Sequence, residues 1–248
     1  MHFQLFLIAH QTFSILRKNK FLYLALGLPF FFLWGAQQLG TWTIGDQQKV
    51  LYDMLAFNLN IAGNIIAIFL GHQLLLTLDQ NYCNALDFAS PISRETWVFG
   101  RFLGLSLALL ALLLVQMVAW YFILLINEFE FFFQLDLKIF ITHYLGWLCT
   151  GSLALFFSSF SHKTTSFFLA LLCWIVGLAS PLLIEASGDP ESINFSKVFS
   201  QVWNLQRFNV SYKDILEFGD LFSLYLYGLG LIGIFLIATI HIFARKDI

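Results

Sequence analysis

The feature that most constrains this chain is a series of long apolar runs separated by short polar connections. Hydrophobic residues make up 59% of the sequence and charged residues only 11%, well below the charged fraction usual in soluble domains. A helix needs about 20 mostly apolar residues to cross the hydrocarbon core of a membrane. Several runs reach that length, so the sequence predicts an all-α integral membrane protein.

Apolar length predicts six transmembrane helices, and an even number places both termini on one side of the membrane. The spans are expected at 21–39, 55–78, 98–126, 139–160, 165–184 and 221–244. The basic residues on the terminus side are then Arg17, Lys18, Lys20, Arg94, Arg101, Lys163, Arg245 and Lys246. Those on the other side are Lys49, Lys138, Lys197, Arg207 and Lys213. The excess on the terminus side predicts cytoplasmic termini by the positive-inside rule.

Two segments outside the spans have a mixed polar and apolar pattern. Residues 1–20 are too short and too polar to span, and they are expected to form an interfacial helix or a plain extension of the first span. The long outer loop 185–220 carries apolar residues at helical spacing, which predicts short helices on or in the outer membrane surface, or a solvated loop. The outer connections are acidic and include Glu128, Glu130 and Asp136.

Polar groups within the expected spans are few, and almost none is ionisable. A charged group in a span costs about 2.5–3.5 kcal/mol on insertion scales and is a default functional candidate, so their scarcity speaks against a proton relay or an ion-coupled carrier. Asn60 and Asn64 lie four apart on one helix face, and Gln116 lies in the third span. Such amides either bond between helices or line a translocation path.

Small residues and tryptophans are expected to have structural roles. Gly100 and Gly104 form a small-xxx-small pair that permits close helix approach. The tryptophans near the expected span ends are interpreted as interfacial anchors, because their rings favour the headgroup level. The set includes Trp42, Trp97, Trp120, Trp147 and Trp203.

The sequence contains no pattern typical of catalysis or of nucleotide binding. No His, Cys, Asp or Glu set has metal-ligand spacing, and no G-x-S-x-G motif is present. No Gly-Lys pair occurs, so the chain has no P-loop of its own. The three scattered cysteines indicate neither a disulfide framework nor a thiolate metal site, and the net charge of -2 gives no reason to expect nucleic acid as a partner.

The connection between the second and third expected spans differs from the others. It has a mixed helical pattern from Asp79 and stops at Ser90 and Pro91, because a proline disfavours the helical conformation in the residue before it. Ser93 can then cap the next helix, with Glu95 in its first turn. The sequence therefore predicts a short helix across the cytoplasmic membrane face, joined by a tight turn to a long span.

This corner resembles the permease subunits of ABC transporters of the ABC-2 type. The resemblance is carried by ALDFASPISR at 85–94 and RFLG at 101–104, at the position where family members have an acidic segment, S-P-I-S-R and a basic-x-L-G entry. Further stretches follow in the same order, at 158–165, 203–208, 214–216 and 243–247. They are similar in particular to permeases of the gliding-motility type and of the type serving nitrous oxide reductase maturation.

The resemblance implies a six-span half of an exporter-like pore in a bacterial inner membrane. It would pair with a second copy or a related permease and sit on two ATPase subunits, which would hold ATP and Mg. Residues 79–94 would be the coupling helix that docks on the ATPase. The residues implied in that contact are Asp79, Leu86, Asp87, Pro91, Ile92, Arg94 and Glu95. The alternatives are a membrane scaffold that does not transport and a membrane enzyme acting on lipid.

Overall fold

The computed structural model describes residues 2–18, 47–76, 93–130, 132–186, 201–210 and 218–245, together with single positions between 20 and 38. Within these ranges the chain is helical and holds no strand. The helices are α1 (His2–Arg17), α3 (Gln47–Leu76), α5 (Arg94–Ile126), α6 (Phe133–Ser158), α7 (Lys163–Ala186), the short 3-10 helix η1 (Leu205–Phe208) and α9 (Phe218–Ala244). The expected all-α class is confirmed.

Five of these helices are long and apolar enough to cross a membrane. They are α3, α5, α6, α7 and α9, and they match the expected spans from the second to the sixth. The structure begins these helices before the apolar runs, as at Gln47 of α3 and Phe133 of α6, because residues of mixed polarity precede the apolar run within the same helix. The expected first span, 21–39, falls mostly outside the described residues.

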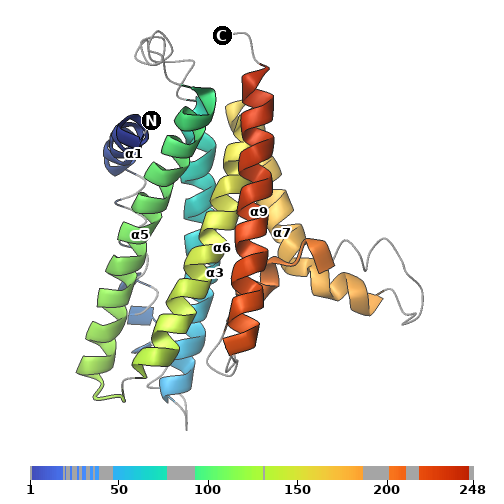
Figure 1. Cartoon of the computed structure of the whole chain (residues 1–248). Coiled ribbons are helices and arrows are strands. Elements are labelled where there is room, and N and C mark those ends of the chain that lie inside the picture. The colour runs from blue at the N-terminus through green and yellow to red at the C-terminus, as the bar shows by residue number, and fades with distance from the viewer. Residues whose placement is uncertain are drawn as a thin grey trace.

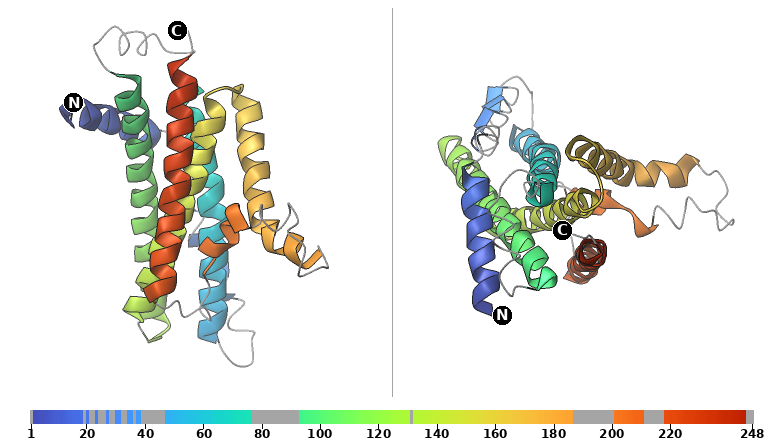
Figure 2. Two further views of the ribbon diagram at one scale, coloured as in Figure 1. Left: turned by 45° about the vertical axis from the view of Figure 1, so that its right-hand side comes forward. Right: turned by 90° about the horizontal axis from the view of Figure 1, so that it is seen from above.

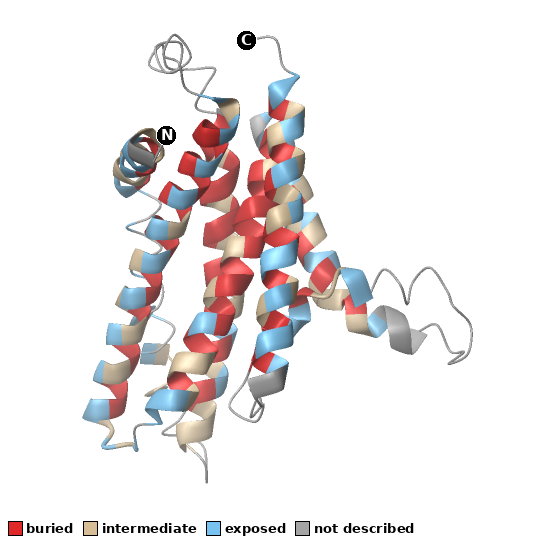
Figure 3. Ribbon diagram, in the orientation of Figure 1, coloured by how far each residue is buried: buried red, intermediate tan, exposed pale blue. Residues whose placement is uncertain are grey.

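The five long helices form a bundle with α6 at its centre (Figure 1). In their most apolar windows, 78% of α6 and 67% of α3 is buried inside the protein, against 28–44% for α5, α7 and α9. The outward faces of those three helices carry exposed apolar side chains, including Leu107 and Val118 of α5 and Ile237 of α9 (Figure 3). Such surfaces suit lipid rather than water, and the five helices are compatible with a multi-pass membrane protein.

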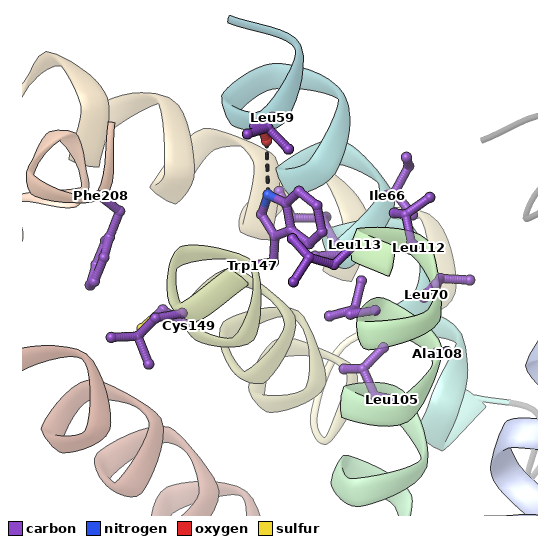
Figure 4. Close-up of a cluster of buried hydrophobic side chains, with 14 of the residues drawn as sticks. Leu59, Ile66, Leu70, Leu105, Ala108, Leu112, Leu113, Trp147, Cys149 and Phe208 are labelled. Carbon is purple, nitrogen blue, oxygen red and sulfur yellow. Dashed lines mark hydrogen bonds between the residues drawn. The ribbon is translucent and has the colours of Figure 1, made fainter. Parts of the chain in front are cut away.

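Close packing of α3 on α6 sets the centre of the bundle (Figure 4). The Trp147 ring of α6 is fully buried, and its indole N–H donates to the Leu59 carbonyl of α3 over 2.8 Å. Gly63 of α3 lies directly against that ring, which fills the space that a side chain at position 63 would need. Trp97 and Trp120 are also fully buried, so the interpretation of these three tryptophans as interfacial anchors is wrong.

Helix α1 lies crosswise to the bundle, near the end at which α5 begins and α9 finishes (Figure 2). It packs on α5 through Ile8, Ala9, Thr12 and Leu16, while Phe6 and Leu7 are exposed. Helix α1 and the end of α9 therefore occupy the same end of the bundle.

Candidate functional site

The corner that the sequence singles out is described only at its end. Residues 77–92 lie outside the described residues, and with them Asp79, Leu86, Asp87, Pro91 and Ile92. Ser93, Arg94 and Glu95 are described, and they begin α5.

Ser93 is the N-cap of α5, as the sequence predicts. Its backbone is extended, with φ −67 and ψ 142, and its hydroxyl oxygen accepts a hydrogen bond from the Thr96 amide over 3.2 Å. The Ser93 and Thr96 hydroxyls lie 2.7 Å apart and are hydrogen-bonded to each other. Glu95 is exposed in the first turn, where a negative charge is favourable at the positive end of the helix dipole. The turn into α5 is thus well defined.

Arg94 joins the start of α5 to the end of α9. One guanidinium nitrogen, Nη1, donates to the carbonyl oxygens of Phe243 over 3.0 Å and of Ala244 over 2.8 Å. These carbonyls belong to the last turn of α9, whose C-terminal end attracts a positive charge. The rings of Trp97 and Phe243 stack beside this contact, with centroids 5.2 Å apart and planes 4° from parallel. These contacts hold the start of α5 against the end of α9, although the two helices are far apart in sequence.

Helix α1 is attached to the same part of α5. Gly100 faces Ile8, and Gly104 faces Thr12 and the Ala9 carbonyl, so a side chain at either glycine would collide with α1. The small-xxx-small pair is therefore confirmed as a site of close helix packing.

Arg101 adds a buried polar contact between α1 and α5. It is 2% exposed, its guanidinium lies 4.8 Å from the Trp97 ring centroid, and it donates to the Thr12 hydroxyl over 3.4 Å. The sequence indicated only a charge near the membrane surface at this position. We call α1, the first turns of α5 and the last turn of α9 the corner unit.

The amides expected in the spans fall into two groups. Asn64 donates to the carbonyl of Asn60 over 2.6 Å and to its side-chain oxygen over 3.1 Å, and it accepts from the Thr150 hydroxyl of α6 over 2.9 Å. This network joins α3 to α6, as an interhelical role for the pair predicts. Gln116 is fully buried in α5, and neither atom of its amide has a hydrogen-bond partner among the described residues. Asn58 of α3 is also buried, and its side-chain amide likewise has no hydrogen-bond partner among the described residues.

Asp136 is a buried acid that the sequence placed wrongly. It was expected in the outer acidic connection, because the apolar run begins at 139, but α6 begins at Phe133 and encloses Asp136 in its first turn. The side chain is 0% exposed, and the Tyr52 hydroxyl and the Trp120 indole N–H lie beside its carboxylate. The expectation of almost no ionisable group in the spans is corrected at this residue and at Arg101.

The described part of the outer loop, residues 201–210, packs among the long helices. The Trp203 indole donates to the Cys173 carbonyl of α7 over 2.8 Å, and the Phe208 ring stacks on Tyr227 of α9. The Tyr227 hydroxyl accepts from the Asn204 amide and donates to the Val202 carbonyl, each over 2.9 Å. These ten residues therefore pack against α7 and α9 rather than forming a wholly solvated loop.

Over the described ranges, no group of three or more His, Cys, Asp or Glu side chains is arranged to hold a metal ion. Comparison with known protein families finds no family model that matches the chain, and comparison with curated proteins finds no significant match. The candidate site is therefore defined by its geometry: the corner unit at one end of the bundle, and buried polar groups along α3, α5 and α6.

Proposed function

We propose that the chain is the permease subunit of an ABC transporter of the ABC-2 type, and most simply of an exporter. Six spans with both termini in the cytoplasm of a bacterium would form half of the pathway, and a second copy or a related permease would form the other half. Separate ATPase subunits would supply the ATP chemistry with Mg. The five long apolar helices, and the common end shared by α1 and the end of α9, support this topology.

The observation that supports the proposal most is the construction of the corner unit. Arg94, the last residue of the expected coupling helix, is fixed to α9, and the residues that follow it are fixed to α1 by the contacts of Gly100 and Gly104. A force applied at 79–94 would therefore move three helices together rather than bend α5 alone. Coupling in a transporter requires such a rigid connection, because a partner can shift the spans only between discrete packed states.

In this mechanism the permease alternates between two packed states. It makes and breaks no covalent bonds itself. Closure of the ATPases on ATP would draw the two coupling helices together and carry each corner unit with them. The exposed carboxylate of Glu95 lies at the surface that the ATPase would approach, while the Arg94 guanidinium is held by α9. Of the two charges implied in docking, Glu95 is thus the one placed to meet a partner, and Arg94 is the one placed to transmit its movement.

Site-specific cross-linking tests the docking surface. In a background with Cys83, Cys149 and Cys173 replaced by serine, we expect Glu95→Cys to form a cross-linked adduct with a P-loop ATPase in native membranes. Asp53→Cys is the matched control, because Asp53 is exposed on α3 at the opposite end of the bundle. Mass spectrometry of the adducts decides the outcome. Equal adducts from both positions, or no ATPase adduct from Glu95→Cys, would count against this surface.

A further inference from the structure

Asp136 carries the one acidic side chain that is buried among the described residues, and the corner unit does not use it. The groups beside its carboxylate are two neutral donors, the Tyr52 hydroxyl and the Trp120 indole N–H. Enclosing an ionised carboxylate with no positive charge beside it costs several kcal/mol, so such a group is retained where it meets a positive charge in some state of the protein. The surroundings of Asp136 indicate what kind of charge that is.

Among the described residues, no positively charged side chain acts on this carboxylate. Lys138 follows two residues later, and residues two apart on a helix do not share a face. The positive end of the α6 dipole offers only a partial charge. The groups that act on the carboxylate from neighbouring helices are Tyr52 of α3 and Trp120 of α5, and Asp136 in turn acts on Tyr121. All three are aromatic and uncharged.

Two of these aromatic groups contact each other beside the acid. The rings of Tyr52 and Trp120 meet edge to face, with centroids 4.8 Å apart and planes at 68°. Aromatic faces attract cations within about 6 Å of the ring centroid, and tryptophan does so most strongly. Gln116 lies one helical turn before Trp120 on the same face of α5, and its fully buried amide has no partner among the described residues. Three helices thus contribute an acid, aromatic rings and an amide at neighbouring levels.

This set of groups suits an organic cation better than a metal ion. Calcium takes six to eight oxygen ligands, and magnesium requires near-octahedral oxygen coordination. A single carboxylate next to rings does not provide these ligands. A quaternary ammonium or phosphonium ion has its charge spread over apolar groups, so it can lie in apolar surroundings and against aromatic faces.

We propose that Asp136, Tyr52 and Trp120 form a binding site for a lipophilic organic cation, with Asp136 as its counter-charge. This inference rests on the proposed function in one respect: the cation is the cargo of the permease. The three side chains are at most 1% exposed, so entry requires α3, α5 and α6 to separate. Separation of spans is the movement by which a permease alternates between states. Binding itself requires no ATPase.

Equilibrium binding of radiolabelled tetraphenylphosphonium to the full-length chain in lipid nanodiscs tests this site. We expect saturable binding that Asp136→Asn weakens at least tenfold, because the substitution removes the charge and keeps the shape. Asp136→Glu is expected to retain most of the affinity, and Trp120→Leu to lose part of it. Asp53→Asn is the control, since Asp53 neighbours Tyr52 in sequence but is exposed, and it should bind like the unaltered protein.

Tetraphenylborate, an anion of nearly the same shape, should not compete. If Asp136→Asn does not fold, as judged by gel filtration, Asp136→Glu and Trp120→Leu decide the outcome. Absence of saturable tetraphenylphosphonium binding, equal affinity in Asp136→Asn, or equal competition by the borate overturns the site. If the chain binds tetraphenylphosphonium but no ATPase accompanies it when it is purified from its native membrane, the site stands and the permease assignment fails, so the two proposals fail separately.

Discussion

Replacing Gly63 with valine is expected to destabilise the bundle by about 3 kcal/mol or more, the upper part of the range for overpacked cores. The new side chain would occupy the position of the Trp147 ring. That ring cannot move aside easily, because it is fully buried and its indole N–H is hydrogen-bonded to Leu59. For a chain of this size the loss corresponds to a fall of roughly 6–12 °C in Tm. Thermal unfolding of the purified protein in detergent measures it.

Gly230→Val is the matched control for this experiment. Gly230 lies in α9, and nothing stands within 4 Å of the position that a side chain would take there. We therefore expect its Tm to stay close to that of the unaltered protein. Combining Gly63→Val with Trp147→Leu should restore part of the lost stability, because residues in contact have non-additive effects. Equal Tm values for Gly63→Val and Gly230→Val would show that the α3–α6 contact is not packed as described.

Replacing Arg94 with glutamate is expected to lower ATP hydrolysis by the assembled transporter at least tenfold, while the amount of chain in the membrane stays unchanged. The substitution removes two hydrogen bonds from a charged donor, each worth about 1.5–3 kcal/mol, and sets a negative charge against the carbonyls of Phe243 and Ala244. A loss of 1.4 kcal/mol in the coupled step already corresponds to about tenfold in rate. The ATPase rate of the purified complex is the measurement.

Two controls separate coupling from general damage. Arg94→Lys keeps a positive charge at the end of α9 and should give an intermediate rate. Arg17→Glu makes the same charge change at an exposed position of α1, at the same end of the bundle, and should have little effect. Pro91→Gly is expected to lower the ATPase rate of the complex, as Arg94→Glu does. A wild-type ATPase rate in Arg94→Glu would remove Arg94 from the mechanism.

The parts of the fold that could be predicted depend on neighbours in sequence. A hydrocarbon core selects for apolar length, so the positions of the long helices follow from the chain alone. The cap at Ser93 follows from local turn chemistry, and the close approach at Gly100 and Gly104 follows from small-residue spacing. These features need no knowledge of which helices are neighbours.

The parts that could not be predicted depend on contacts between distant segments. The contact of Arg94 with the carbonyls of α9 was not predicted, because these partners are 149 and 150 residues away. Trp147 was interpreted as an anchor because nothing in the sequence pairs it with Gly63. Asp136 was assigned to a connection because an apolar window cannot show that a helix begins in polar sequence. Each of these features depends on packing, which periodicity alone does not determine.

Purification of the tagged chain from its native membrane in mild detergent tests the central claim most directly. The proteins that accompany it are identified by mass spectrometry, and the ATP hydrolysis of the preparation is measured. We predict a stoichiometric P-loop ATPase with magnesium-dependent hydrolysis, and weaker association when Glu95 is replaced. Recovery of the chain without any ATPase, under conditions in which ABC complexes remain intact, would contradict the account and favour a membrane scaffold.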